Sequence, residues 1–175
     1  FGSGLTLSLS GDLSKRSNRY EVALKNPAIN DSDYNGEVEA HSTKIEYRRS
    51  HYDSDVKTKG FSLAAGKEVV RNTYVGARYG LDFISEVYNY ENSFLTTYNA
   101  QSQTFKDQNK LFQDQDYTNS SITPYINYDS TNDFYFPTAG IKAGASVEYA
   151  GVGGDSKYIK PGVNFRYFYS LEDLT

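Results

Sequence analysis

Cysteine, methionine and tryptophan are absent from this sequence of 175 residues, and histidine occurs only twice. The lack of cysteine excludes disulfide frameworks, thiolate metal sites and cysteine nucleophiles. The lack of methionine leaves no initiator residue, and no charged and then apolar leader opens the chain. We therefore expect the sequence to be a processed or excised piece of a protein.

Long apolar runs and an excess of basic charge are also missing. No run approaches the roughly 18 apolar residues that a membrane-spanning helix needs, which excludes helical insertion. The formal net charge is -4 and the pI is about 5.2, so we expect no nucleic-acid partner. The mean hydropathy is -0.66 although aromatic residues reach 15%. That combination is ordinary for a membrane barrel whose lumen and loops are polar.

What the sequence does contain is alternation with a period of two. Between residues 75 and 83 apolar side chains occupy every second position, and Gly, Arg or Asp stand between them. Residues 141–149 repeat the pattern. Because successive side chains of a strand point to opposite faces, each stretch would be apolar outside and polar inside as a wall element of a barrel.

Period-two runs between turn signals predict an all-β fold, an antiparallel up-and-down transmembrane β-barrel with about eight strands present. Each predicted strand is near the roughly 9 to 11 residues that a tilted strand needs to cross a bilayer. The strands are expected near residues 3–13, 19–27, 36–49, 59–69, 73–88, 121–131, 140–150 and 157–170.

The predicted connections fall into two sets. Compact turns are expected at residues 26–36, 70–72 and 132–140, and polar connections at 48–59 and at about 89–120. Outer-membrane barrels place short turns in the periplasm and longer polar loops outside. We therefore interpret residues 1–175 as one partial barrel domain with a long extracellular loop at about 89–120, which has room for a short helix near residues 105–113.

Three features test the strand assignments. Pro124 and Pro161 fall inside predicted strands, where a residue without an N–H is usually confined to edges or bulges, so one or both are expected to mark a bulge. Residues 36–49 change phase, and a bulge near Ser42 would restore a common face. Aromatic clusters at residues 88–90, 134–136 and 167–169 are expected to form interfacial girdles.

Catalytic and metal-binding patterns were sought and not found. His41 is expected in the wall and His51 in a loop, and neither belongs to a triad or a nucleophile elbow. Paired aspartates at 31/33, 53/55 and 114/116 lack the further ligands and the turn glycine of a calcium loop. Residues 151–155 are glycine-rich but precede no helix, so they predict a hairpin turn. We expect no catalytic residue, no cofactor and no metal.

Two segments contain distinctive turn elements. In residues 129–140 an Asp-containing turn is followed by the element Phe136-Pro137-Thr138-x-Gly140, and a strand and a Gly/Asp-rich hairpin tip come next. Upstream, the predicted strand of residues 21–27 ends in Asn26-Pro27. Both segments resemble the BamA-like family of outer-membrane β-barrel assembly factors. Asn26, Pro27, Phe136, Pro137, Thr138 and Gly140 are the expected family-marking turn residues, in a structural role.

The resemblance implies that the chain is the middle part of a larger barrel of about sixteen strands in the outer membrane of Gram-negative bacteria. The complete protein would fold and insert other barrels through a lateral seam, by templating their strands, without covalent chemistry. The implied partners are outer-membrane lipids, client β-barrel proteins, accessory lipoproteins of the assembly complex and the remainder of the barrel. The family's periplasmic repeats and Arg-Gly-Phe loop have no counterpart in this sequence.

Three alternatives stay open at this point. The chain could form a self-contained small barrel serving as an anchor or adhesin, in which residues 3–13 would pair with 157–170 and close an interior filled by paired charges. Those charges would be Arg78, Asp82, Lys142, Glu148, Lys160 and Arg166. A passive secretion pore of a related transporter family would share the wall pattern. In a soluble β-sandwich, a second sheet would cover the apolar face.

Overall fold

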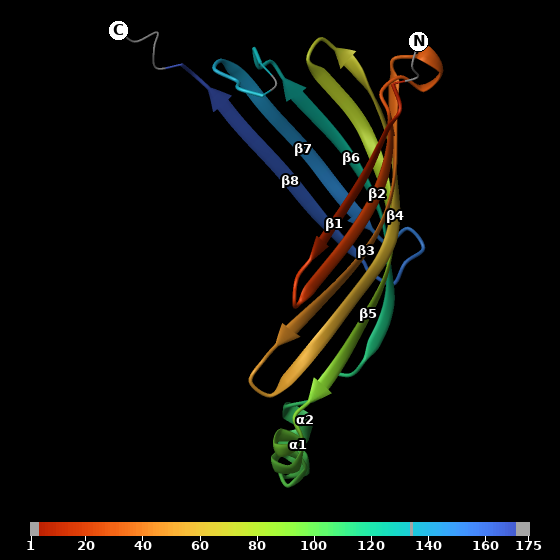
Figure 1. The fold of residues 1–175 in the computed structure, drawn as a ribbon. Coiled ribbons are helices and arrows are strands. Elements are labelled where there is room, and N and C mark those ends of the chain that lie inside the picture. Colours follow the sequence, from red (N-terminus) through yellow and green to blue (C-terminus); the bar gives the residue numbers. More distant parts are fainter. Residues whose placement is uncertain (1–3, 134, 171–175) are drawn as a thin grey trace.

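The computed structural model describes residues 4–133 and 135–170, which form one eight-stranded antiparallel sheet with the strands in chain order (Figure 1). The strands are β1 (Thr6–Leu13), β2 (Ser17–Asn26), β3 (Tyr34–Arg48), β4 (Tyr52–Val70), β5 (Thr73–Tyr90), β6 (Gln115–Asp129), β7 (Gly140–Ala150) and β8 (Tyr158–Phe168). The all-β, up-and-down prediction is confirmed. Within the described residues β1 pairs only with β2 and β8 only with β7, so the sheet is open.

Two strands begin well before the positions that the sequence pattern predicted. β4 begins at Tyr52, so the expected polar connection at residues 48–59 was wrong: the turn is residues 49–51 and the rest is strand. β6 begins at Gln115, six residues before the predicted start. Both errors have one cause: the outward-facing positions of these segments are polar, so the apolar alternation that marks the other strands is missing there.

The predicted bulges were also wrong. β3 pairs with β2 and with β4 in unbroken register through Ser42. Pro161 lies opposite Val147 without a shift, and Pro124 only interrupts the ladder, since β6 and β7 pair at Ile122 and again from Tyr125 in the same register. The irregularity lies between Glu68 and Val70, at the tight turn into β5. A proline can therefore remove a ladder donor without displacing the strand.

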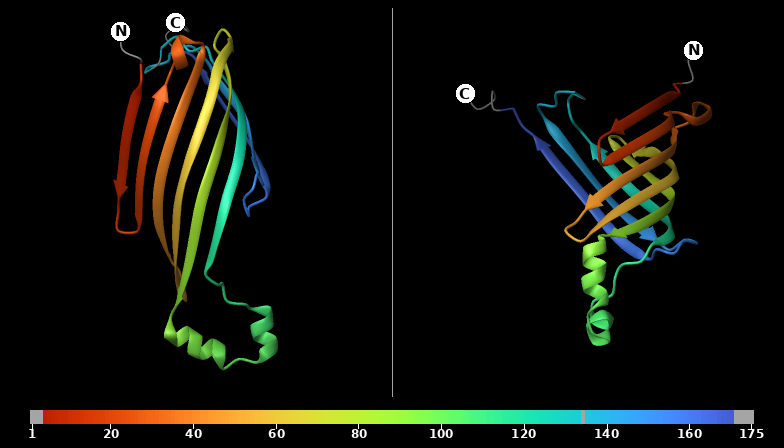
Figure 2. Two further views of the ribbon diagram at one scale, coloured as in Figure 1. Left: turned by 90° about the vertical axis from the view of Figure 1, so that its right-hand side faces the viewer. Right: turned by 60° about the horizontal axis from the view of Figure 1, so that its bottom comes forward.

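The sheet is strongly curved, with a trough-like concave side, and the start of β1 and the end of β8 lie at one end (Figures 1 and 2). The connections β2–β3, β4–β5 and β6–β7 lie at that end, which we call the terminal end. The connections β1–β2, β3–β4, β5–β6 and β7–β8 lie at the other, which we call the helical end. This segregation follows from antiparallel order, and the longest connection, residues 91–114, is at the helical end.

Three short helical segments complete the fold. A 3-10 turn, η1 (Ile29–Asp31), lies between β2 and β3, and α1 (Asn92–Asn99) and α2 (Gln103–Gln108) lie between β5 and β6. α2 overlaps the first half of the predicted helix at 105–113, whereas α1 was not predicted. Among the described residues no helix has both the length and the apolar character to cross a membrane.

The sheet has no apolar core. In the part of the chain that the structure describes, only Ala23 and Ala150 are buried apolar residues, whereas Leu9 is 72% exposed and Val163 is 83% exposed. A water-soluble domain of this size would bury a large apolar core and would not leave such a surface open. Since no second sheet covers the convex face in the described residues, the sandwich alternative loses its support.

Candidate functional site

The convex face carries a continuous apolar band. Its members occupy every second position of neighbouring strands and are mostly exposed: Leu7, Leu9, Val22, Leu24, Val38, Phe61, Leu63, Phe83, Ile122, Ile126, Val147, Ile159, Val163 and Phe165. Val75, Ala77 and Leu81 lie on the same face by strand parity. A surface of this kind is stable against hydrocarbon chains and unfavourable in water. The band is therefore the face that meets a membrane.

The concave face is polar, and its charges meet across strands. Arg78 on β5 reaches Glu37 and Glu39 on β3, at 3.5 and 3.8 Å between side-chain nitrogen and oxygen, although β4 lies between. Side chains two strands apart converge in this way only on the inner side of a curved sheet. Lys25 on β2 adds a 3.4 Å pair with Glu37. The inner wall is thus a linked set of opposite charges beside a polar lumen.

A glycine creates the closest of these inner contacts. His41 Nε2 on β3 lies 3.1 Å from Asp82 Oδ1 on β5, directly over Gly60 of β4. A Cβ at Gly60 would collide with that Asp82 oxygen and come within 2.7 Å of the Leu81 carbonyl oxygen. The His41 Nδ1 atom is buried without a hydrogen bond, 3.5 Å from Glu39 Oε1. The missing side chain at Gly60 therefore leaves a gap in β4, which we call the Gly60 window. Through this gap His41 of β3 contacts Asp82 of β5.

Three of the other four predicted lumen charges pair along the wall as well, and the fourth, Arg166 on β8, lies opposite Lys142. Lys142 lies 3.2 Å from Asp129, and Lys160 lies 4.0 Å from Glu148. Both pairs join neighbouring strands and face the lumen by strand parity. They do not plug a closed small barrel, because β1 and β8 form the two separate edges of the described sheet. The pairing of residues 3–13 with 157–170 that such a barrel requires is contradicted for the described residues.

Beyond the band, toward the helical end, the two faces exchange character. On the convex side Lys44 pairs with Glu46 at 2.6 Å and with Asp55 at 3.5 Å. On the concave side, Ile45 lies opposite Val56. This exchange explains the phase change in residues 36–49 that the sequence suggested was a bulge. The strand continues without interruption, and its outward side changes from apolar to charged.

Aromatic rings hold the helical loop to the sheet. Phe112, near the end of the loop, lies 5.3 Å from the ring of Tyr88 and 5.7 Å from that of Tyr52. The Phe112 backbone N–H donates to the Tyr90 hydroxyl oxygen at 2.7 Å. His51 stacks on Phe94 of α1 at 4.9 Å. Residues 88–90 thus belong to a loop anchor, and their prediction as a girdle was wrong because Tyr88 and Tyr90 point to the concave side with Tyr52.

The remaining predicted girdle residues lie at the terminal end. Tyr135 and Phe136 are 81% and 83% exposed in the β6–β7 turn, and Tyr167 and Tyr169 stack at 6.5 Å on and beyond β8. Tyr167 faces outward by parity with Ile141. Phe134 lies outside the described residues. These exposed aromatics suit the border of an apolar band.

The turn that carries the Phe136-Pro137-Thr138-x-Gly140 element is built by two side chains that sequence reasoning missed. The Asn132 side-chain oxygen accepts from the backbone N–H groups of Thr138 and Ala139, both at 3.0 Å, and its amide donates to Thr138 Oγ1 at 2.8 Å. Asp133 Oδ1 accepts from the N–H groups of Tyr135 and Phe136, both at 2.8 Å. Asx-type turns of this kind, visible as Asn-Asp after a strand, were the available signal.

Gly140 is required by the backbone. Its φ is +111°, and a Cβ there would strike the Ser130 carbonyl oxygen and lie 2.7 Å from Thr131 Cα. A glycine can adopt this conformation at no steric cost.

The hydrogen bonds that the backbone N–H groups of Phe136 and Tyr135 donate to Asp133 lower the pKa of the Asp133 carboxyl, because they favour its charged form.

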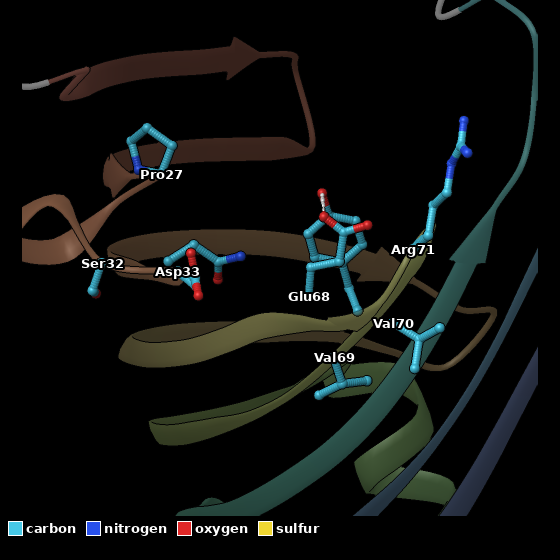
Figure 3. A pocket seen from close by; sticks show the side chains of 9 residues that line it. Pro27, Ser32, Asp33, Glu68, Val69, Val70 and Arg71 are labelled. Carbon is cyan, nitrogen blue, oxygen red and sulfur yellow. Dashed lines mark hydrogen bonds between the residues drawn. The ribbon is translucent and has the colours of Figure 1, made fainter.

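Asn26 and Pro27 form the other predicted element, at the same end of the sheet. The Asn26 side-chain oxygen accepts from the Ala28 N–H at 3.1 Å, which turns the chain after β2. Pro27 borders a hollow of about 600 Å³ that also touches Asp33, Glu68 and Arg71 (Figure 3). The two elements lie on strands separated by β3, β4 and β5, so the structure does not bring them into one site.

No arrangement for covalent chemistry is visible in the described residues. His41 stands in β3 and His51 in the β3–β4 turn, as predicted. Within the described ranges, no three His, Cys, Asp or Glu side chains are grouped so as to hold a metal ion. The arrangement can separate a membrane from a polar lumen.

A family comparison agrees with this geometry. The model of the Omp85 superfamily domain matches residues 1–175, the whole chain. This chain belongs to the Omp85 superfamily. The outer-membrane localisation that we expected is typical of that family, and the convex apolar band of this Omp85 chain is the surface it requires.

A solved structure shows the same fold. The chain is similar to BamA from Haemophilus ducreyi lacking POTRA domains 1–3, with 20% sequence identity and a TM-score of 0.68. The match covers 93% of this chain and 31% of that chain. The Omp85 chain therefore corresponds to a portion of a BamA-like barrel, and spans less than a third of the length of the protein it matches.

Proposed function

We propose that this chain is part of the wall of an outer-membrane protein insertase that folds and inserts β-barrel proteins. The complete barrel would open at a seam between its first and last strands, and the edge of a client would pair with the exposed strand. The seam lies outside this chain, which supplies wall strands and part of the loops at the helical end. The reaction is an exchange of hydrogen bonds, and no catalytic residue or cofactor takes part.

The two-faced wall is the observation that supports this proposal. Its convex face is apolar and exposed, its concave face is lined by paired charges, and the chain as a whole matches the Omp85 superfamily domain. An unpaired backbone group in hydrocarbon costs several kcal/mol, so strand edges in a membrane are driven to pair with any available strand. Here the remainder of the barrel would satisfy both edges, and client strands would use the same chemistry at the seam. The proposed partners are lipids, client barrels, the remainder of the barrel and accessory lipoproteins.

Reconstitution of the complete protein tests the proposal. Unfolded client barrel protein is added to vesicles with or without the inserted protein, and folding is followed by the shift in gel mobility of the unheated sample. We expect client folding to be faster with the inserted protein. A variant whose first and last barrel strands are joined by a disulfide should lose the acceleration and regain it on reduction. Equal folding rates in all vesicles would contradict the proposal.

A passive secretion pore is the second candidate, and the polar inner face favours it. The charges that line the wall, such as Arg78 with Glu37, suit a water-filled passage as well as an insertase lumen. The same vesicles discriminate between the two functions. A pore would give steady ion conductance and release of an encapsulated polypeptide, with no effect on client folding.

A further inference from the structure

The convex face changes from apolar to cationic at one border. Along β4 the outward positions are Leu63, Phe61, Lys59, Lys57 and Asp55, in order toward the helical end. Leu63 and Phe61 are exposed members of the apolar band, and Lys59 and Lys57 are exposed too. The first charges met on leaving the band along this strand are therefore two lysines, and the carboxylates follow only beyond them.

These two lysines have no carboxylate partner, unlike their neighbour. Lys44, directly opposite Lys57 on β3, is held by Glu46 at 2.6 Å and by Asp55 at 3.5 Å. In the part of the chain that the structure describes, neither Lys57 nor Lys59 takes part in an ion pair. Asp55, the acid closest to Lys57 on the same strand face, is already engaged by Lys44. Two ammonium groups that form no ion pair within the described residues thus occupy neighbouring outward positions at the edge of the band.

A surface groove lies between the two lysines and β6. The groove has a volume of about 380 Å³ and is bordered by Lys57 and Lys59 of β4, Phe83 of β5 and Thr118 of β6. Asp116 and Asp155 also line the groove. The Asp155 carboxylate accepts a hydrogen bond from the Thr118 backbone N–H at 2.7 Å. The groove thus has two lysines on its β4 side and contacts the apolar band at Phe83.

We propose that Lys57 and Lys59 bind the phosphate of a lipid headgroup in the leaflet next to the helical end. A phosphate accepts from ammonium donors, and lysines at a membrane border extend their charged ends into the headgroup layer while their stems cover apolar surface. The acyl chains of the same lipid would lie on Phe61, Phe83 and Leu63. This inference rests on the membrane position that the proposed function gives the chain, and adds a binding site and a ligand class to it.

Lipid retention tests this site. The complete protein is placed in nanodiscs of phosphatidylethanolamine that contain diphosphoryl lipid A, and the lipid A that stays bound after transfer to detergent is quantified. We expect the double variant Lys57→Gln/Lys59→Gln to bind about thirtyfold more weakly. Lys44→Gln, a matched control on the same face whose charge is already paired, should stay within about twofold of the parent. The variant Lys57→Arg/Lys59→Arg should keep binding.

Two further measurements use the unmutated protein, so a folding defect of a variant cannot affect them. The unmutated protein should retain diphosphoryl lipid A and release lipid A from which the phosphates have been removed. Inorganic phosphate should compete only at far higher concentration than the lipid. Equal retention of both lipids, unchanged binding by the double glutamine variant, or equally effective competition by free phosphate would each overturn the site. Client folding is measured on the same samples, so failure of the insertase proposal would be seen separately.

Discussion

The middle of β3, β4 and β5 and the outer part of the same strands contrast sharply. In the middle, the convex side carries Val38, Leu63 and Leu81, and the concave side carries charges such as Glu39 and Arg78. In the outer part, toward the helical end, the convex side carries the Lys44 ion pairs and the concave side carries aromatic rings. The pleat and the register are continuous between the two regions. What differs is the kind of side chain on each face.

This contrast shows that alternation reports the environment of a strand, not the strand itself. Where lipid surrounds the wall, the outward side chains must be apolar, because no water is present there to hydrate a polar group. Where water surrounds it, the outward side becomes charged, and the concave side can bury rings against the loop. A strand that crosses the border therefore looks like two unrelated segments in the sequence.

A charge placed in the band should cause the largest effect. Leu63→Arg sets a cation on the lipid side of the middle region and should lower the free energy of unfolding by about 2–4 kcal/mol. Val87→Arg is the matched control, because Val87 faces the same side in the outer region opposite Asp55. It should cost no more than about 1 kcal/mol. Denaturant titration of the complete protein in vesicles measures both, and equal costs would remove the contrast.

Closing the Gly60 window should be the next largest effect. Gly60→Ala puts a methyl group against Asp82 and the Leu81 carbonyl oxygen, and should destabilise the middle region by about 1–3 kcal/mol. Gly80→Ala on the neighbouring strand is the control, since its nearest atom, Ser121 Oγ, is 3.7 Å away. The same titration applies. If Gly80→Ala cost as much as Gly60→Ala, the loss of glycine itself and not the window would be responsible.

Removing the loop anchor should act only on the outer region. Phe112→Ala deletes the ring that contacts Tyr52 and Tyr88, and aromatic pairs of this kind contribute about 0.5–1.5 kcal/mol. Proteolytic cleavage within residues 91–114 should accelerate about three- to tenfold, while the unfolding midpoint of the barrel barely moves. Phe83→Ala, a ring on the convex face, should leave loop cleavage unchanged. A general fall in barrel stability with Phe112→Ala would contradict a local anchor.

The smallest effect concerns the terminal end, outside both regions. Backbone donors lower the pKa of Asp133, so its contribution to the turn is present above the unfolded value of about 3.9 and is lost as pH falls through the lowered value. Protection of the Tyr135 and Phe136 amides from hydrogen exchange, corrected for intrinsic rates, should decrease over that range. Asp133→Asn should give weaker protection that no longer depends on pH. A parent protein whose protection is flat to low pH would refute the role of the carboxylate.

Sequence reasoning recovered the parts of the molecule that repeat locally. The eight strands, their antiparallel order and the outward side of residues 75–83 follow from a period of two and from turn residues. It missed the start of β4 and placed a bulge at Ser42, because it assumed one medium along the whole strand. It named Gly140, whose φ is +111°, but overlooked Asn132 and Asp133, whose side chains build the turn before it.

The sequence by itself determined that this protein is a strand wall with an apolar and a polar side, since the side-chain direction in a strand depends only on whether a position is odd or even. The tertiary structure decided which side chains meet. Arg78 reaches Glu37 across β4, and His41 reaches Asp82 over Gly60, because register and curvature bring together residues about 40 positions apart. Such convergence depends on several strands at once, and no single stretch of sequence contains it.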